Sequence, residues 1–226
     1  MSVVNCVHQV IAIDGPAASG KSSVARALAS RLGFSYVNSG AMYRAVTWLA
    51  LARGVSPNDP AAVEAIAQKT GLVCRLINGE SRIFVDGEDP SAHLFSDQVN
   101  SAVSVVSRVP RVREVVNAQL RHCATERDVV IEGRDIGSIV FPETPFKFFL
   151  DAPPAMRARR RDAQGQRDEI ALRDRADSSR EMAPLVRAPD AEIIDTSDLS
   201  IEQVVEKIIQ QLTVRGLPRL STANRQ

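Results

Sequence analysis

The chain has 226 residues, of which 28 are lysine or arginine and 27 are aspartate or glutamate, so its formal net charge is +1. A charge so close to neutral provides no overall field for nucleic acid or for an anionic membrane surface. No apolar stretch approaches the roughly 20 residues of a membrane-spanning helix, and no secretory signal pattern is evident at the start. The three cysteines are far apart without metal-ligand spacing, which indicates free thiols and a cytoplasmic location.

The most informative segment is GPAASGKS at residues 15–22, which fits G-x-x-x-x-G-K-[ST] throughout. An apolar run precedes it and a helix-competent stretch follows, so the context is strand, loop and helix. Small residues let successive backbone N–H groups point at a phosphate chain, and the following helix adds its positive dipole end. Lys21 would then reach the outer phosphates and the Ser22 hydroxyl would ligate Mg²⁺. The alternative is a glycine-rich turn with a purely structural role.

Five apolar runs predict buried strands, and helical patterns separate or follow them, as in the βαβ units of a parallel sheet. The sequence therefore predicts an α/β fold with a five-stranded parallel sheet flanked by helices. After the last run, SIEQ at 200–203 has the capping-box pattern and begins an amphipathic helix over 204–212. The five runs are 9–14, 34–37, 129–132, 146–150 and 191–195.

Two segments interrupt this alternation. Strand-like pieces flank Asn78-Gly79 within residues 71–89, a strong hairpin signal, so we expect a small antiparallel insertion over about 60–105. Residues 157–187 carry more arginine than acidic side chains; by charge alone this composition is typical of a solvated helix face. We predict a single domain whose core segments are 9–59, 106–156 and 188–213.

Three further clusters carry polar side chains. NSGAMYR at 38–44 and EGRDIG at 132–137 each begin where a predicted strand ends, so both are expected to face the same crevice as the glycine loop. Arg44 suits bidentate binding of a second phosphate, although a lone arginine is also typical of a surface. The alternative for EGRDIG is a tight turn whose Arg134 and Asp135 only pair with each other. In the third cluster, RDRADSSR at 173–180, the spacing places Arg173, Asp177 and Arg180 on one helical face.

With these motifs, the chain resembles the bacterial cytidylate kinase family of P-loop nucleoside monophosphate kinases over nearly its whole length. The glycine loop alone indicates only the superfamily, whereas EGRDIG with NSGAMYR is specific. That family enlarges its monophosphate-binding region where the hairpin is predicted. The matching segments are IDGPAASGKSS (13–23), NSGAMYRAV (38–46), PRVR (110–113), EGRDIGSIVFP (132–142), FFLDA (148–152), RDRADSSR (173–180) and APLV (183–186).

The resemblance implies transfer of the ATP γ-phosphoryl group to CMP or dCMP, with Mg²⁺, by a monomer that binds only small molecules. It implies catalytic roles for Lys21, Arg134 and Arg180, and an arginine-rich lid that closes to exclude water. ATP would be bound by Gly15, Pro16, Ala17, Ala18, Ser19, Gly20, Lys21, Ser22 and Ser23. The acceptor would be bound through its base by Ser39, Ser104, Arg113 and Asp135, through its phosphate by Arg44, Arg134 and Arg180, and through its sugar by Arg173 and Asp177.

The chemistry of cytosine supports this assignment independently. Its 4-amino group donates to a carboxylate or hydroxyl, and its N3 and O2 accept from an arginine. Uracil reverses this pattern at positions 3 and 4, so Asp135 and Arg113 are the best candidates for base discrimination. No general base is demanded, because a phosphate monoester with a second pKa of about 6 is mostly dianionic at neutral pH.

Two features depart from the family pattern. The stretch between Arg161 and Arg173 is shorter than usual, which leaves the roles of Arg157, Arg159, Arg160 and Arg161 open. Asn38 stands where aspartate is more usual, and we expect a mild effect. Another kinase, for UMP, AMP or a small metabolite, would share the glycine loop but not EGRDIG with NSGAMYR. A P-loop GTPase switch would need an N-K-x-D motif, which is absent.

Overall fold

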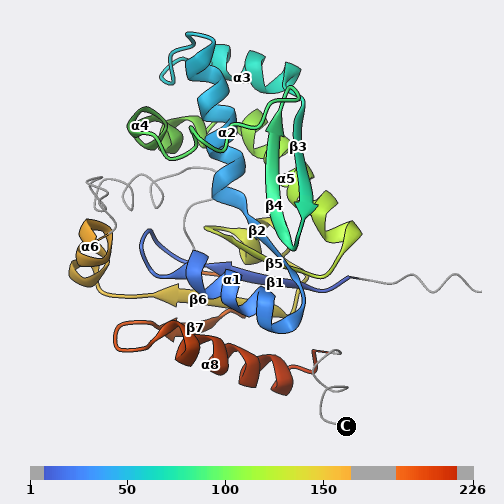
Figure 1. Ribbon diagram of the computed structural model, residues 1–226, viewed down its shortest axis with the longest axis vertical. Helices are drawn as coiled ribbons and strands as arrows, with labels where there is room; N and C mark the ends of the chain where they lie inside the picture. The colour runs from blue at the N-terminus through green and yellow to red at the C-terminus, as the bar shows by residue number, and fades with distance from the viewer. Residues whose placement is uncertain (1–7, 164–186, 218–226) are drawn as a thin grey trace, which may run out of the picture.

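A computed structural model describes residues 8–163 and 187–217. Its centre is a seven-stranded sheet with the strand order β3-β4-β2-β5-β1-β6-β7, in which the last five strands of that order run parallel (Figure 1). The predicted α/β fold is thus confirmed. The strands are β1 Val10–Asp14, β2 Ser35–Asn38, β3 Leu72–Ile77, β4 Glu80–Val85, β5 Val129–Gly133, β6 Phe146–Asp151 and β7 Glu192–Asp195.

The sheet has two more strands than the five predicted, because the hairpin joins it. The hairpin turns at Asn78 and Gly79, with φ values of 53° and 79°, as the sequence predicts. β3 and β4 pair antiparallel, and Tyr36 on β2 pairs with Glu80 on β4. The hairpin therefore extends the parallel sheet at one edge. That junction depends on a pairing between distant residues, which local hydrophobic runs do not encode.

The first four residues of strand β1 are apolar because helices cover both of its faces. Ile11 and Ile13 belong to the core formed with α1 (Lys21–Leu32) and α8 (Ile201–Val214), whereas Val10 and Ala12 belong to the core formed with α2 (Ser39–Ala52) and α5 (Pro110–Glu126). Successive residues of a strand point to opposite faces, so each core receives alternate side chains. This double burial holds the end of β1 rigidly at the start of the glycine loop.

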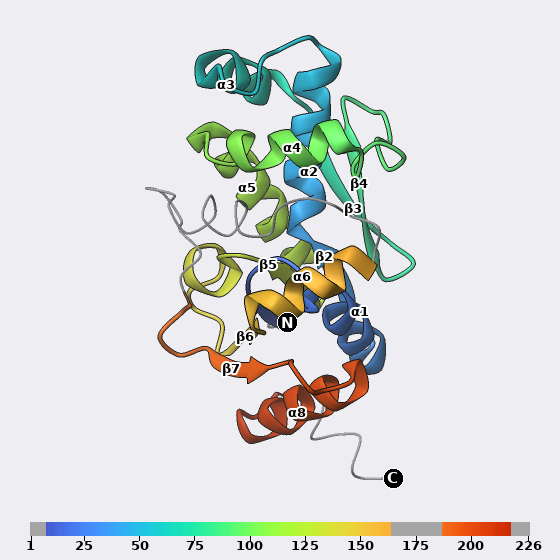
Figure 2. The same cartoon turned by 90° about the vertical axis from the view of Figure 1, so that its left-hand side faces the viewer.

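The remaining helices are α3 (Pro60–Lys69), α4 (Asp97–Val106) and α6 (Pro154–Ala163), with one π-helical turn, η1 (Ile136–Val140). α3 and α4 lie at the end of the molecule opposite α8 (Figures 1 and 2). The predicted insertion therefore contains two helices besides the hairpin. The predicted domain limits at 105 and 157 fall within α4 and α6, and the division into core, insertion and lid stays a prediction.

The helix predicted near the C-terminal end is confirmed. α8 begins with the predicted capping box, in which Ser200 accepts a hydrogen bond from the backbone N–H of Gln203 at 3.3 Å and donates its own N–H to the Gln203 side chain at 2.8 Å. Within the described ranges, no helix has the length and apolarity needed to cross a membrane.

Candidate active site

The glycine loop connects β1 to α1, as the sequence predicts. Gly15 has a φ of 149°, and a Cβ placed on it would lie 2.1 Å from the carbonyl oxygen of Leu150, so only glycine fits there. Gly20 is the N-cap of α1 with a φ of 92°, and as a glycine it provides no side chain to cap the first amides of that helix. Such amides are suited to an anion. The Lys21 ammonium donates to the carbonyl of Pro16 at 2.5 Å, within the loop.

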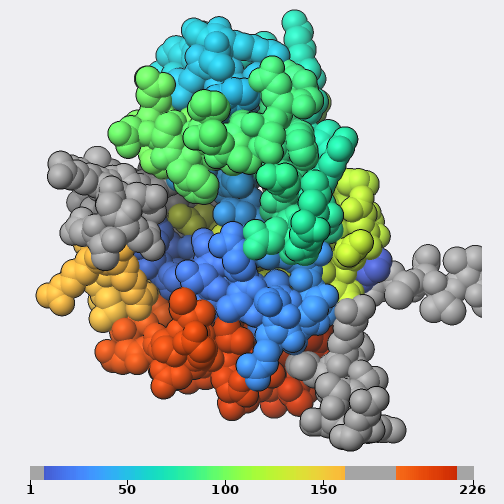
Figure 3. All heavy atoms as spheres, viewed as in Figure 1, coloured from blue at the N-terminus to red at the C-terminus, as the bar shows by residue number. Residues whose placement is uncertain are grey.

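A cavity of about 200 Å³ lies where β2 and β5 end, beside the glycine loop. In the space-filling view the surface is hollowed between the blue N-terminal residues and the green segment above them (Figure 3). This is the predicted crevice at the carboxyl ends of the strands. The predicted site residues that line it are Ala17, Ala18, Lys21, Ser22, Ser39, Arg44, Ser104, Arg113, Arg134 and Asp135.

Not every predicted site residue borders this cavity. Five members of the loop and first helical turn are absent from its lining, namely Gly15, Pro16, Ser19, Gly20 and Ser23. Three predicted acceptor or catalytic residues lie outside the described residues, namely Arg173, Asp177 and Arg180. Their roles therefore stay predictions from the resemblance.

Arg44 is held in the cavity wall by neighbours from α4 and the segment before it. Its guanidinium donates to the carbonyl of Leu94 at 3.0 Å and to the side chain of Asn100 at 2.7 Å. It also lies 4.9 Å from the centre of the Phe95 ring, and only 7% of the residue is exposed. Arg44 is thus a fixed positive charge at the cavity, rather than a surface arginine.

The helix that carries Arg44 is preceded by Asn38, the position where aspartate is more usual. The Asn38 side-chain oxygen accepts a hydrogen bond from the backbone N–H of Ala41 at 3.1 Å and so caps α2. Asparagine and aspartate are about equally good at this position. The departure therefore preserves the helix start and the placement of Ser39, whose hydroxyl donates to the carbonyl of Glu132 at 2.7 Å.

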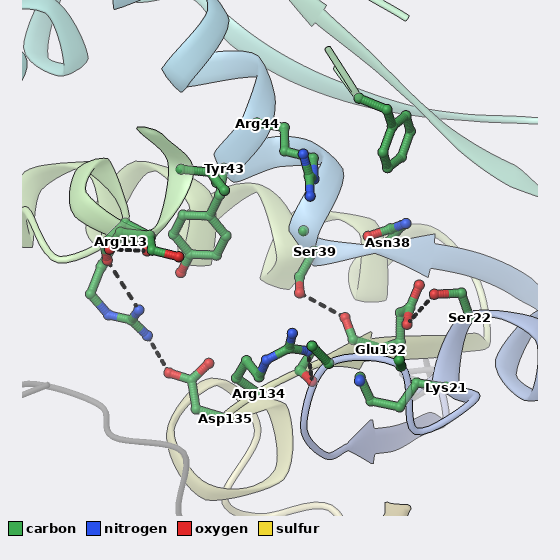
Figure 4. A pocket seen from close by; sticks show the side chains of 18 residues that line it. Lys21, Ser22, Asn38, Ser39, Tyr43, Arg44, Arg113, Glu132, Arg134 and Asp135 are labelled. Atoms are coloured by element: carbon green, nitrogen blue, oxygen red, sulfur yellow. Dashed lines mark hydrogen bonds and ion pairs between the residues drawn. The ribbon is translucent and has the colours of Figure 1, made fainter. Parts of the chain in front are cut away.

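Arg113 on α5 and Asp135 after β5 form a buried ion pair that borders the cavity (Figure 4). Arg113 also donates to the carbonyl of Ser107 at 3.5 Å, and its guanidinium lies 5.7 Å from the centre of the Tyr43 ring. EGRDIG is therefore more than a turn closed on itself, because Asp135 reaches a side chain of a distant helix. The pair offers a carboxylate and an arginine side by side.

Glu132 is a site residue that the sequence analysis did not single out. One of its carboxylate oxygens accepts from the Ser22 hydroxyl at 2.8 Å, and the other accepts from the Tyr36 hydroxyl at 2.5 Å. Burial, chiefly, and the neighbouring Glu132 raise the pKa of Tyr36 well above its usual range, so Tyr36 stays a donor. A carboxylate at the end of an otherwise apolar buried strand was the available signal, since glutamate is rarely buried without a reason.

Ser22 and Glu132 supply the hard oxygen donors that Mg²⁺ prefers. Figure 4 shows them together with Lys21 on one side of the pocket, with Arg113 and Asp135 on the other. A magnesium ion usually keeps several waters and needs few protein ligands besides the phosphates. The hydroxyl and carboxylate present therefore fit the predicted metal.

Arg157, whose role the sequence left open, contacts the glycine loop. It is buried in α6 and donates to the carbonyls of Ala152 at 2.9 Å and Ala17 at 3.2 Å. Arg160 instead donates to the side chain and carbonyl of Thr196, at 3.0 and 2.6 Å. The start of α6 thus braces the loop from outside the cavity.

A glycine loop between a parallel strand and a helix, facing a cavity with lysine and several arginines, defines a P-loop phosphotransferase. The family profile described as cytidylate kinase matches residues 11–214. The chain belongs to the cytidylate kinase family.

Curated relatives agree with this assignment. The cytidylate kinase of Streptomyces avermitilis is 43% identical over 88% of this chain and 90% of its own length. That of Pelotomaculum thermopropionicum is 44% identical over 90% of this chain and 95% of its own length. A bifunctional pantoate ligase/cytidylate kinase of Parasynechococcus marenigrum is 44% identical over 91% of this chain but only 44% of its own.

Proposed function

We propose that this protein transfers the γ-phosphoryl group of ATP to CMP or dCMP, giving ADP and CDP or dCDP. The observation that carries the proposal is a single cavity that joins the glycine loop to the buried Arg113–Asp135 pair. The loop supplies a site for the triphosphate, and the pair supplies a site for the base of the acceptor. A protein that only hydrolyses ATP does not need the Arg113–Asp135 pair.

The base site follows from the hydrogen-bonding groups of the pair. Asp135 accepts from the 4-amino group of cytosine, and Arg113 donates to its ring acceptors. Both side chains already lie in place and are largely desolvated, so little ordering remains when the base binds. Uracil would present an acceptor to the Asp135 carboxylate, and the unpaired groups would strongly disfavour it.

The phosphoryl transfer needs positioning and charge neutralisation. The acceptor phosphate is mostly dianionic at neutral pH, so one of its oxygens attacks the γ-phosphorus without a protein base, and ADP leaves with the electron pair of the broken bond. Lys21, Arg44 and Arg134 hold and neutralise the phosphates. Ser22 and Glu132 would hold Mg²⁺, which when bound neutralises charge on the outer phosphates of ATP. Arg173, Asp177 and Arg180 keep the acceptor roles that the resemblance implies, within the lid at 157–187.

The test is an ADP-release assay with Mg-ATP against CMP, dCMP, UMP, AMP and no acceptor. Fast turnover confined to CMP and dCMP is expected. Preference for AMP or UMP would indicate a kinase for another acceptor, and release without acceptor would indicate a hydrolytic switch. Either result would overturn the proposal while leaving the glycine loop as a nucleotide site.

The near-neutral charge of the chain supports small-molecule substrates over nucleic acid. We also propose that the protein is a cytoplasmic monomer.

A further inference from the structure

Asp14 links the glycine loop to the turn that carries two of the acceptor-site residues. It is the last residue of β1, directly before Gly15, and only 6% of it is exposed. Its carboxylate bridges two successive backbone amides: Oδ1 accepts from Ile136 at 2.8 Å and Oδ2 from Gly137 at 2.7 Å. These amides come directly after Asp135.

The turn depends on this contact for its shape. Asp135 has φ −148° and ψ 26°, outside the regular helix and strand regions, and its own side chain does not cap the turn of η1 that follows. Asp14 supplies that cap from another strand. Packing leaves little room, because a Cβ on Gly137 would lie 3.1 Å from the Lys147 side chain. The direction in which Asp135 reaches Arg113 is therefore set largely by Asp14.

We propose that Asp14 is a positioning residue for acceptor recognition, whose carboxylate fixes the turn that presents Arg134 and Asp135 to the nucleoside monophosphate. The inference rests on the proposed function for the identity of the acceptor. Asp14 does not line the cavity. It acts through the two amides that it holds.

The charge of Asp14 sets the strength of this bridge. Burial raises the pKa of Asp14 to about 6, although the two amide hydrogen bonds oppose the rise; Asp135 adds repulsion and Lys21 attraction. From β6, Lys147 faces the turn, but its ammonium is bound by Asp190 at 2.8 Å and by the carbonyl of Pro142 at 2.7 Å. When the Asp14 carboxyl is protonated, its O–H faces one of the two amide N–H groups. Two donors then face each other, and that hydrogen bond is lost. The bridge therefore weakens as the pH falls through about 6.

The first measurement follows the backbone amides of the wild-type protein by ¹⁵N NMR between pH 5 and 8. We expect the Ile136 and Gly137 amide signals to titrate together with a midpoint near 6, and the same signals in Asp14→Asn to stay constant. A midpoint near the ordinary value of aspartate, about 4, or no common titration would overturn the bridge as the group that responds to pH.

The second measurement compares the kinetics of Asp14→Asn and Asp128→Asn. Asp128 offers a matched control, because its carboxylate accepts from the backbone N–H of Gln9 at 2.8 Å at the opposite end of β1. Asp14→Asn replaces one acceptor oxygen by an amide that opposes an N–H. We expect its KM for CMP to rise at least tenfold while its KM for ATP changes less than threefold, with Asp128→Asn near wild type on both. Equal effects on both substrates, or none, would contradict a positioning role.

If Asp14→Asn does not fold, a binding measurement on the wild-type protein tests the inference instead. The dissociation constant for CMP, expressed per dianion by using the ³¹P titration of free CMP, should still rise about tenfold from pH 7 to pH 5. A constant value would overturn the inference. If CMP is not the acceptor, wild-type turnover with CMP fails at every pH while the amide titration persists, so the proposed function and this inference fail separately.

Discussion

Arg113 and Asp135 hold each other in a direct ion pair at the cavity, with 6% and 5% of their side chains exposed. Two charges removed from water in this way are costly, and apolar residues of similar volume are often as stable. Stability therefore does not explain the pair. Its position in the cavity that the glycine loop also borders explains it better, since a base can bind the two groups that the protein has already desolvated.

Replacing one partner of this pair should destabilise the protein more than replacing both. Asp135→Ala leaves the Arg113 guanidinium buried and unpaired, so we expect the free energy of unfolding to fall by roughly 3–5 kcal/mol. The double variant Arg113→Met with Asp135→Leu should recover much of that loss and remain inactive on CMP. Urea denaturation of the three proteins measures the difference. A double variant as unstable as Asp135→Ala would mean that the pair itself stabilises the fold.

Base selectivity should depend on the carboxylate of Asp135. In Asp135→Asn the side-chain amide can also donate, so it tolerates the 4-carbonyl of uracil better than a carboxylate does. We expect the ratio of kcat/KM for CMP over UMP to fall at least tenfold. Glu114→Ala is the control, because Glu114 is an exposed carboxylate on the same helix as Arg113. An unchanged ratio in Asp135→Asn would remove Asp135 from base recognition.

The sequence predicts the central strands well because their burial is local information. A run such as residues 10–13 is apolar at every position since both faces are covered, and Asn78-Gly79 encodes its own turn. The attachment of the hairpin to the core sheet was missed, because it depends on Tyr36 meeting Glu80 across a long separation. α3 and α4 were missed as well, inside a segment interpreted from its hairpin alone.

The site shows the same division between local and long-range information. Arg44 and Asp135 could be placed at the crevice from the strands that precede them. Glu132 and Asp14 escaped notice because each is the polar end of an apolar run, and their importance lies in partners from other elements: Ser22 and Tyr36 for one, the amides after Asp135 for the other. The sequence shows that these carboxylates are present, but only the fold shows which groups they accept hydrogen bonds from.

Glu132 should prove essential to the use of Mg²⁺. Glu132→Gln keeps the shape of the side chain but removes the charge beside Ser22, so we expect kcat to fall at least 100-fold, as when a preorganised electrostatic contact is lost. The Mg²⁺ concentration for half-maximal rate should rise about tenfold. Tyr36→Phe, which removes the donor to the other oxygen but keeps the charge, should have the smaller effect on both. The reverse ranking would argue that the hydrogen bond from Tyr36 matters more than the carboxylate.

Asp14 should lower stability at neutral pH, in keeping with a functional role. Its pKa is raised from 3.8 to about 6 in the folded protein, so between these values the folded state binds more protons than the unfolded state. Stability contributed by this group is therefore present at low pH and lost as the pH rises to about 6. We expect the free energy of unfolding of wild type, relative to Asp14→Asn, to fall by roughly 2.4 kcal/mol between pH 4 and pH 7. Urea titrations of both proteins at several pH values measure it, and a difference that rises with pH would contradict the direction.

Gly15 and Gly20 should differ sharply in their tolerance of alanine, although both belong to the glycine loop. Both have positive φ, which costs a residue with a side chain about 1–3 kcal/mol. At Gly20 a Cβ meets nothing within 4 Å, whereas at Gly15 it would lie 2.1 Å from the carbonyl oxygen of Leu150 on β6. We therefore expect Gly20→Ala to fold with a modest loss of stability, and Gly15→Ala to unfold at much lower urea concentration or to lose ATP binding by displacing the loop. Isothermal titration with ATP and urea denaturation of both variants separate the two effects. Equal losses would show that φ, and not the approach to β6, requires glycine at position 15.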